Sequence, residues 1–162
     1  MSDTVLVSIR KFLTEQEVSF FEKEHAQTFT SEESAAARGE ELSVGAKALL
    51  LKTDDVFRLF VLPADKKLDS TAIRSRLNVK KTRFATREEL LELTGLVPGS
   101  VPPFGHPILP FELFADATIG TERDRVAFNA GSLTNSIIMS ATDWLKVAQP
   151  QRFLFAKSDE PA

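Results

Sequence analysis

The sequence predicts one compact α+β domain with a mixed, largely antiparallel sheet. Three observations carry this prediction. The 162 residues, 43% of them hydrophobic, suit a single domain with a sizeable core. Signals for helices and strands are interspersed along the chain. Several connections between the expected strands are too short for a helical crossover, which disfavours a regular βαβ winding.

Capping patterns and helical spacing place the helices. Capping boxes, in which Ser or Thr is followed three residues later by an acidic side chain, begin at Thr30, Thr86 and Ser140. Gly or Asn follows several of the apolar stretches and indicates where a helix ends. The expected helices are Val5–Leu13, Ser34–Arg38 ending at Gly39, one from Asp69 or Ser70 to Asn78, Glu88–Leu93 ending at Gly95, and Trp144–Val147.

Apolar and β-branched runs predict the strands. Two of them, Lys47–Leu51 and Val56–Leu62, are separated by Thr53-Asp54-Asp55 and indicate a hairpin. No internal repeat, low-complexity stretch or Gly/Ser linker interrupts the chain, so residues 1–162 are expected to form one domain, with 158–162 as a disordered tail. The remaining expected strands are Val18–Phe21, Glu112–Ala115, Val126–Asn129, Ser136–Met139 and Phe153–Phe155.

The composition excludes several classes of chemistry. The chain has no Cys, which excludes a thiol nucleophile, disulfides and thiolate-bound metal clusters. His25 and His106 are the only histidines, so a zinc site of three histidines is impossible. No Gly-rich dinucleotide fingerprint or phosphate loop occurs. We therefore expect neither a cofactor nor a metal.

The chain lacks membrane and export signals. No apolar run approaches the ~20 residues that a membrane span needs, and the N-terminus does not resemble a secretory signal. We expect a cytoplasmic protein that binds no membrane. The net charge of −3 argues against a globally basic nucleic-acid binder, and DNA is not an expected partner.

The charge is unevenly distributed. Residues 66–87 hold eight basic side chains and one acid, a local charge of +7, so the rest of the chain carries −10. Such a segment attracts polyanions even in an acidic protein. A solvated helix and loop is the more common explanation of a run of charges, and the pattern alone leaves both open.

Lys47 has an unusual position in its expected strand. Strand alternation places Lys47 on the same face as Leu49 and Leu51, at the start of an apolar row. A lysine in this position either extends its ammonium to solvent or meets an anion at the rim of a pocket.

The segment from Thr94 to Pro107 is rich in residues that restrict or free the backbone. It holds three Gly and four Pro in fourteen residues. Gly allows close approach of a ligand, whereas Pro fixes φ and removes N–H donors. A stiff loop that binds through its backbone is one interpretation, and a rigid connector between a helix and a strand is the other.

These features occur in an order that identifies a family. The chain resembles, over about residues 5–157, the YbaK/ProX family of aminoacyl-tRNA deacylases, which are related to the editing domain inserted in bacterial prolyl-tRNA synthetases. The segments that carry the resemblance are Thr30–Ala36, Gly45–Leu49, Leu93–Gly105, Asp116 and Phe128–Ser132.

The resemblance implies a mixed sheet curled into a partial barrel and flanked by helices. It also implies hydrolysis of the ester between a wrong amino acid and the tRNA 3′ end, assisted by the ribose hydroxyl and without a protein nucleophile. The family's lysine matches Lys47, and its glycine-to-proline loop matches Gly99 through Pro103. Further substrate-binding residues are then expected at Ser100, Val101, Gly105, His106, Asn129, Ala130, Gly131 and Ser132.

Several other residues are of types that can have a functional role. His106 follows the loop and is either a donor to the substrate or an ordinary loop histidine. Asp116 is expected to cap a turn or orient the sheet edge, Trp144 to lie in the core, and His25 to have little functional role. Ser132 lacks the Gly-x-Ser-x-Gly elbow of a hydrolase nucleophile.

We therefore expect a free-standing deacylase that clears a small amino acid from a non-cognate tRNA, with tRNA-Pro as the first candidate. The expected partners are the 3′ acceptor end of aminoacyl-tRNA and an aminoacyl-tRNA synthetase. Lys80, Lys81 and Arg83 in the basic segment are the candidate tRNA contacts. The alternative is a non-catalytic module of the same fold that binds a tRNA end or a synthetase.

Overall fold

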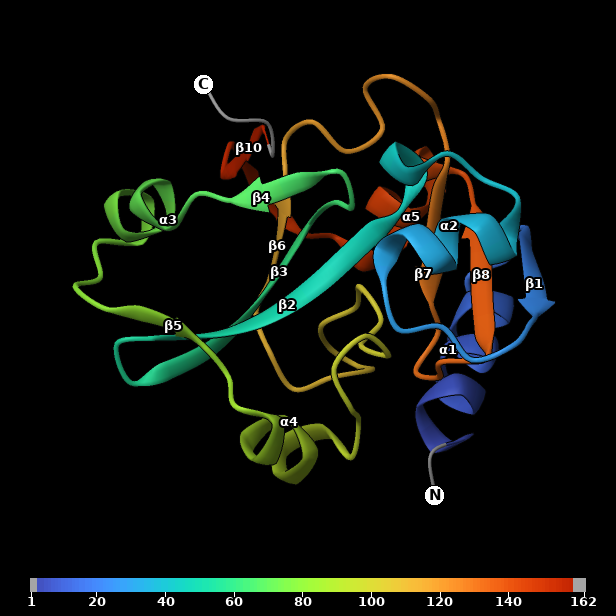
Figure 1. Ribbon diagram of the computed structural model, residues 1–162, viewed down its shortest axis with the longest axis horizontal. Helices are drawn as coiled ribbons and strands as arrows, with labels where there is room; N and C mark the ends of the chain where they lie inside the picture. The colour runs from blue at the N-terminus through green and yellow to red at the C-terminus, as the bar shows by residue number, and fades with distance from the viewer. Residues whose placement is uncertain (1–2, 159–162) are drawn as a thin grey trace.

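A computed structural model describes residues 3–158. In that range the chain forms five α-helices, one 3₁₀ helix and ten strands (Figure 1). The helical elements are α1 Asp3–Glu15, α2 Ser31–Arg38, η1 Leu42–Val44, α3 Ser70–Leu77, α4 Arg87–Thr94 and α5 Ala141–Ala148. The strands are β1 Phe20–Glu24, β2 Ala46–Thr53, β3 Val56–Pro63, β4 Lys66–Leu68, β5 Thr82–Phe84, β6 Leu113–Asp116, β7 Val126–Asn129, β8 Asn135–Met139, β9 Gln151–Phe153 and β10 Ala156–Ser158.

The hairpin β2–β3 forms the centre of a five-stranded sheet with the order β5-β2-β3-β6-β9. Strands β3, β6 and β9 run parallel to one another, and every other pairing between the named strands is antiparallel. A second sheet has the order β1-β8-β7, and β4 pairs with β10. The expected mixed α+β architecture with mainly antiparallel pairing is confirmed, and its sheets do not close into a barrel.

The two larger sheets meet where β2 begins. Gly45 forms an isolated parallel bridge to Ala127 in β7. A Cβ atom at Gly45 would lie 2.9 Å from the Cβ of Ala64 and 3.2 Å from the carbonyl oxygen of Leu42. Only glycine fits between these two groups. The bridge to Ala127 places the start of β2 beside β7.

The helix caps at Thr30, Thr86 and Asp69 form as the sequence predicts, whereas at Ser140 the hydroxyl accepts from the N–H of Asp143 without a complete capping box. Thr30 and Thr86 each accept a hydrogen bond from the N–H group three residues later, and Glu33 and Glu89 complete the two capping boxes. Asp69 caps α3 by accepting from the N–H of Ala72. Left-handed residues end these helices at the expected positions, Gly39, Asn78 and Gly95.

The expected strand boundaries are wrong at both ends of the chain. The first strand covers Phe20–Glu24 rather than Val18–Phe21, and its charged residues lie on a sheet edge. The last expected strand, Phe153–Phe155, is divided because Phe155 turns away to donate its N–H to Asp116. The expected tail begins too early: Ser158 lies in β10, opposite Lys66, and the rest of the tail lies outside the described residues.

Short polar strands escaped prediction. The strands β4, β5 and β10 contain three residues each and carry mainly Lys, Arg, Thr and Ser. They lack the apolar alternation that distinguishes a longer strand in sequence. Pairing with strands distant in the chain decides their conformation.

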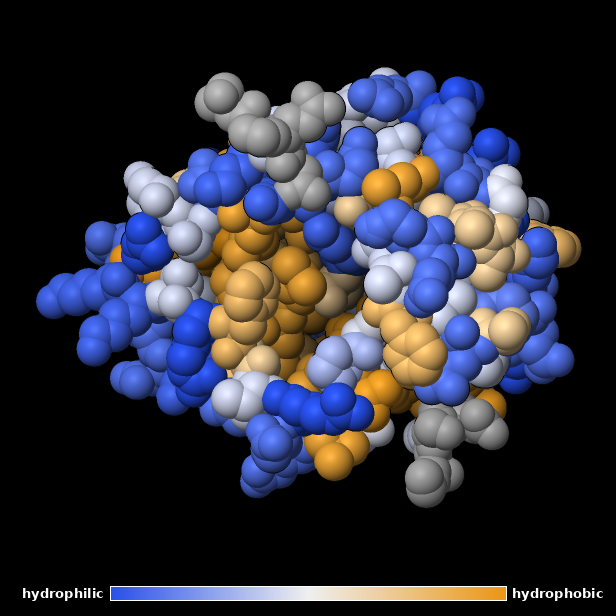
Figure 2. Space-filling view, in the orientation of Figure 1, coloured by the Kyte–Doolittle hydropathy of each residue, from blue (hydrophilic) through white to orange (hydrophobic). Residues whose placement is uncertain are grey.

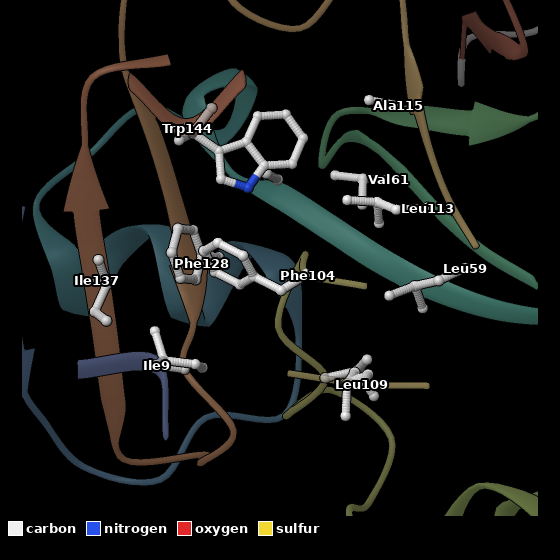
Figure 3. Packing of buried hydrophobic residues seen from close by; sticks show 14 of the residues in the cluster. Ile9, Leu59, Val61, Phe104, Leu109, Leu113, Ala115, Phe128, Ile137 and Trp144 are labelled. Carbon is white, nitrogen blue, oxygen red and sulfur yellow. The ribbon is translucent and has the colours of Figure 1, made fainter. Parts of the chain in front are cut away.

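The larger core joins α1, α5 and the two main sheets. Phe104, from the segment before β6, packs edge-on against Phe128 of β7 with ring centroids 5.5 Å apart (Figure 3). Trp144 of α5 and Ile9 of α1 are fully buried in the same cluster. A smaller core under α3 contains Leu51, Phe60, Leu62, Ile73, Phe114 and Phe155. Among residues 3–158, none of the helices has the length and apolar character to cross a bilayer.

Candidate active site

A cavity of about 170 Å³ opens beside the junction of the two main sheets. Its walls come from the chain before and within α2, the start of β2, the loop around Gly99, and the end of β7 (Figure 1). The lining residues are Thr28, Phe29, Thr30, Ser31, Ser34, Arg38, Gly45, Ala46, Lys47, Ala48, Leu49, Ala64, Gly99, Val101 and Asn129.

Lys47 lies in this wall as the second residue of β2. It is half-buried and faces Leu62 across the β2–β3 pairing. Leu49, two residues further along the strand, lines the same cavity, whereas Leu51 is buried in the smaller core. The apolar row that the strand alternation predicts is therefore present, and Lys47 stands at its cavity end.

Hydrogen bonds hold the Gly/Pro loop at three of its carbonyl groups. The side-chain amide of Asn129 donates to the carbonyl oxygen of Gly99 at 2.6 Å. The N–H of Gly131 donates to the carbonyl of Ser100 at 2.9 Å. The indole of Trp144 donates to the carbonyl of Pro103 at 3.0 Å. Side chains and backbone from the second sheet and α5 thus fix the loop against the cavity.

Two backbone donors in the cavity wall are uncommitted. Within residues 3–158, the N–H groups of Gly99 and Val101 take part in none of the hydrogen bonds. Both residues line the cavity. Gly99 has φ 90°, a left-handed conformation that glycine adopts without strain. The loop therefore contributes to the cavity wall two residues whose N–H groups remain available as donors.

Arg38 is a buried cation in the same wall. Its Nε donates to the hydroxyl of Ser136 at 2.9 Å, and its Nη2 donates to the Oδ1 of Asn129 at 3.1 Å. Among the described residues, the carboxylates all lie beyond 4 Å from its guanidinium. Burial lowers the pKa of Arg38 to about 10, with Glu40 offsetting part of the effect. The side chain remains charged at neutral pH.

These contacts connect Arg38 to the loop. Arg38 donates to the oxygen of the Asn129 amide, so the nitrogen of that amide faces Gly99. Ser136 also donates to the Asn129 oxygen at 3.2 Å. The Nε2 of His25 lies 2.8 Å from the same Ser136 hydroxyl. His25 therefore contacts the site through Ser136 rather than from the cavity wall.

The structure gathers four of the expected site residues and leaves others outside. Lys47, Gly99, Val101 and Asn129 line one cavity. Ser100, Pro103, Gly105, Ala130 and Gly131 are buried behind it, Ser132 bonds to Thr134 and Asn135, and His106 is exposed.

Two further residues have structural roles, as the sequence predicts. Asp116 is fully buried and accepts hydrogen bonds from the N–H groups of Phe155, Ala156 and Thr118. Trp144 is fully buried. Asp116 therefore orders the chain at the edge of the sheet, and Trp144 joins the core to the loop.

Sequence reasoning missed the contribution of α2 and its preceding segment. Thr28, Thr30, Ser31 and Ser34 place hydroxyl-bearing side chains along one wall, and Arg38 closes it. One signal was available: Arg38 follows three alanines and precedes Gly39, an unusual setting for an isolated charge. The side chains that receive its hydrogen bonds are about 90 residues away in sequence.

The basic segment is spread along the sheet: Lys66 lies near Gly45 and Ala46 at the start of β2, whereas β5 pairs with the far end of β2. Lys52 of β2 pairs with Arg83 of β5. Because Lys52 is five residues after Lys47, the two lysines are about 17 Å apart along the strand. Lys80 and Lys81 are exposed in the turn before β5.

Arg83 is engaged by an acid. It forms two hydrogen bonds with Glu89, at 2.8 and 2.9 Å. These bonds hold the pKa of Glu89 down to about 2. Lys80 and Lys81 are therefore better placed than Arg83 to contact a polyanion. In the part of the chain that the structure describes, no group of three His, Asp or Glu side chains is arranged to hold a metal ion.

Comparison with known proteins places the chain in a family. Residues 25–147 match the model of the aminoacyl-tRNA editing domain. The multifunctional Ser/Thr-tRNA deacylase ProXp-y of Escherichia coli K12 is 34% identical over 151 residues, which cover 90% of this chain and 89% of the relative. A proline–tRNA ligase of Shouchella clausii is 34% identical over 101 residues, 62% of this chain and 17% of that enzyme.

The fold has a counterpart among solved structures. The crystal structure of a candidate trans-editing enzyme for prolyl tRNA synthetase superposes with a TM-score of 0.80 at 23% identity, covering 96% of this chain and 98% of that one. The family assignment rests on the match of the family model over most of the chain and on the relative that aligns over nearly its whole length. This chain belongs to the aminoacyl-tRNA editing domain family.

Proposed function

We propose that the protein is a trans-editing hydrolase that removes a small amino acid from mischarged tRNA. One observation carries the proposal: a single cavity of about 170 Å³ combines Lys47, the backbone of the Gly99 loop and Asn129. Membership of the aminoacyl-tRNA editing domain family and a full-length relative that is a Ser/Thr-tRNA deacylase support it.

The dimensions and walls of the cavity favour a small polar aminoacyl group. A cavity of about 150 Å³ accommodates a molecule the size of benzene, so the cavity here accepts the side chain and ester of a small amino acid. Three residues with hydroxyl side chains, Thr30, Ser31 and Ser34, line one wall. The Thr30 hydroxyl also accepts from the N–H of Glu33 and the Ser34 hydroxyl bonds to Thr28, which leaves Ser31 as the first candidate donor. A wall of this kind hydrogen-bonds a substrate hydroxyl and disfavours analogues without one. Serine and threonine are therefore the first candidates, and tRNA-Pro remains the first candidate tRNA.

The chemistry in this proposal is hydrolysis of the aminoacyl ester. Water attacks the ester carbonyl, negative charge develops on its oxygen, and the bond to the ribose oxygen breaks. The N–H groups of Gly99 and Val101 stabilise that charge, because fixed donors need no reorganisation. Lys47 adds positive charge at the rim. The departing ribose oxygen takes the proton that the water loses, so the products are the free amino acid and uncharged tRNA.

A protein nucleophile has no part in this mechanism. The chain has no Cys, and the hydroxyl of Ser132 bonds within its own turn rather than lining the cavity. The neighbouring ribose hydroxyl of the substrate orients the water. We propose the 3′ acceptor end of aminoacyl-tRNA as the bound partner, prolyl-tRNA synthetase as a second partner, and the cytoplasm as the location. The matches to proline–tRNA ligases support the second partner.

The decisive experiment measures deacylation of a panel of tRNAs charged with Ser, Thr, Ala or Cys. The wild-type protein is compared with Lys47→Ala and with a control, Lys146→Ala, whose side chain is exposed on α5. We expect hydrolysis of at least one charged tRNA well above the buffer rate, loss of that activity in Lys47→Ala, and wild-type activity in the control. Binding of charged tRNA with the ester intact would instead support a non-catalytic module.

A further inference from the structure

We infer that the terminal adenine stacks on Phe29 and that the preceding nucleotides cross an apolar surface over β2 toward Phe84. This inference rests on the proposed function and extends it from the ester to the RNA strand. The partner chemistry is a single-stranded nucleic acid end, which combines flat bases with a charged backbone.

The size of the cavity requires the nucleoside to lie outside it. At about 170 Å³, the cavity is filled by a small aminoacyl group, which leaves no room for ribose and adenine. These parts of the substrate must therefore contact its mouth. Phe29 lines the cavity and is 73% exposed, so its ring is available there.

The backbone on both sides of Phe29 is fixed. The N–H of Phe29 and the N–H of Thr30 both donate to the carboxylate of Glu33, at 2.8 and 3.1 Å. The preceding residue, Thr28, is buried, and its hydroxyl bonds to that of Ser34 at 2.9 Å. Phe29 is thus an exposed aromatic side chain on an ordered backbone. An arrangement of this kind suits stacking, because little ordering is needed when a base arrives.

A second exposed aromatic side chain lies on the same face of the sheet. Phe84 of β5 pairs with Leu51 of β2, so both project to the side that also carries Lys47 and Leu49. Phe84 is 58% exposed. Four residues of strand separate Lys47 from Leu51, which places Phe84 about 13 Å along the sheet from Lys47. That length corresponds to about four stacked nucleotides at about 3.4 Å each.

The surface over β2 is apolar and ends beside basic residues. Figure 2 shows apolar side chains covering the molecule over β2, between a hollow beside α2 and the hydrophilic edge near α3 and β5. At that edge Lys52, Arg74, Lys80, Lys81 and Arg83 outnumber Asp54 and Asp55. Lys52 and Arg83 pair with each other and project to the face opposite Phe84, so Lys80, Lys81 and Arg74 are the cations left for phosphates that follow the Phe84 face. Bases crossing the apolar surface would thus bring their phosphates toward positive charge, which is the pattern of a single-strand binding track.

Substrates of two lengths test the inference. The first is seryl-tRNA of the species that the wild-type protein hydrolyses best, and the second is 3′-O-seryl adenosine, which has the terminal nucleoside alone. The variants are Phe29→Ala, Phe84→Ala and a control, Phe21→Ala, whose side chain is 60% exposed on β1, away from the cavity lining. The readouts are kcat and KM for each pair.

We expect Phe29→Ala to raise KM about tenfold on both substrates, because both contain the terminal adenine. Phe84→Ala should raise KM about tenfold on seryl-tRNA and leave seryl adenosine unchanged, because only the longer substrate reaches it. The value of kcat should change little in either variant. Phe29→Trp should restore the KM of the wild type, since stacking requires an aromatic ring and not a particular one.

Other outcomes overturn the inference. An unchanged KM in Phe29→Ala would exclude stacking at the cavity mouth. An equal rise in KM on both substrates in Phe84→Ala would show that Phe84 has a structural role. A rise in KM that appears only when a synthetase is added would show that Phe84 belongs to a protein-docking surface. Wild-type protein without activity on any tRNA of the Ser, Thr, Ala and Cys panel would refute the proposed function itself, which distinguishes the two failures.

Discussion

Replacement of Asn129 by aspartate separates the orientation of the loop from the stability of the fold. The Asn129 amide nitrogen donates to the carbonyl of Gly99 at 2.6 Å, while its oxygen accepts from Arg38 at 3.1 Å. Asn129→Asp keeps the shape and the acceptor but replaces the donor by an oxygen. The new carboxylate would repel the Gly99 carbonyl and attract the buried guanidinium of Arg38.

The expected magnitudes follow from these two contacts. Loss of the hydrogen bond to Gly99 costs about 0.5–1.5 kcal/mol, and an unpaired carbonyl adds about 1–3 kcal/mol where water cannot reach it. If the loop holds the donors that stabilise the transition state, about 1–3 kcal/mol of that stabilisation is lost. The deacylation rate should then fall about 5- to 150-fold. The free energy of unfolding should change by less than about 1 kcal/mol, because the new ion pair with Arg38 offsets the lost bond.

The assay is single-turnover deacylation of the best mischarged tRNA, beside urea unfolding of the same preparations. Asn129→Ala serves as the comparison, because it loses both contacts and should lower rate and stability together. A wild-type rate in Asn129→Asp would refute the role of the Gly99 contact in catalysis. If the deacylation rate falls only in proportion to the fraction of protein that is unfolded, Asn129 has a structural role and no role in catalysis.

Three further predictions concern the loop, an ion pair and the basic segment. Gly99→Ala forces a Cβ into a backbone with φ 90° and should cost about 1–2 kcal/mol of stability in urea unfolding, with a drop in kcat larger than any change in KM. The pKa of Glu89 is lowered from 4.5 to about 2, chiefly by its hydrogen bonds to Arg83, so the folded state binds that proton less readily than the unfolded chain. The contribution of Glu89 to stability is therefore complete above about pH 4.5 and disappears as the pH falls toward 2. Glu89→Gln should flatten this part of the curve of unfolding free energy against pH, measured at low ionic strength. An unchanged slope would contradict the pairing of Glu89 with Arg83. Replacing Lys80 and Lys81 together by Gln should weaken tRNA binding and reduce its dependence on salt, without a change in thermal unfolding; identical salt slopes would show that the two lysines are only solvated surface.

Local signals in the sequence were sufficient for much of the fold. The capping boxes at Thr30 and Thr86 and the left-handed ends at Gly39 and Gly95 formed as predicted. Each depends on residues within a few positions of one another, so no distant contact is needed to predict it. The central hairpin followed for the same reason, from two apolar runs with a short polar turn between them.

Residues that depend on distant partners were less predictable. The short strands β4 and β10 have little apolar character, and their pairing joins positions about 90 apart in the chain. Gly105 and Pro103 were expected in the site because they belong to the loop, yet both are buried behind the cavity. Position along a loop does not determine which groups face a cavity, because the packing of the loop against other elements sets the direction of each.

The sequence by itself determined the α+β class and the resemblance to the editing family, and it singled out Lys47 and Gly99 as candidate site residues. These conclusions rest on local patterns and on their order along the chain, both of which are visible without knowing which distant residues are in contact. The tertiary structure alone decided that Arg38 joins the site, that Asn129 holds the loop by its amide nitrogen, and that Phe29 stands exposed at the mouth. Burial and hydrogen bonding between segments about 30 to 100 residues apart exist only after folding, when distant parts of the chain enclose one cavity.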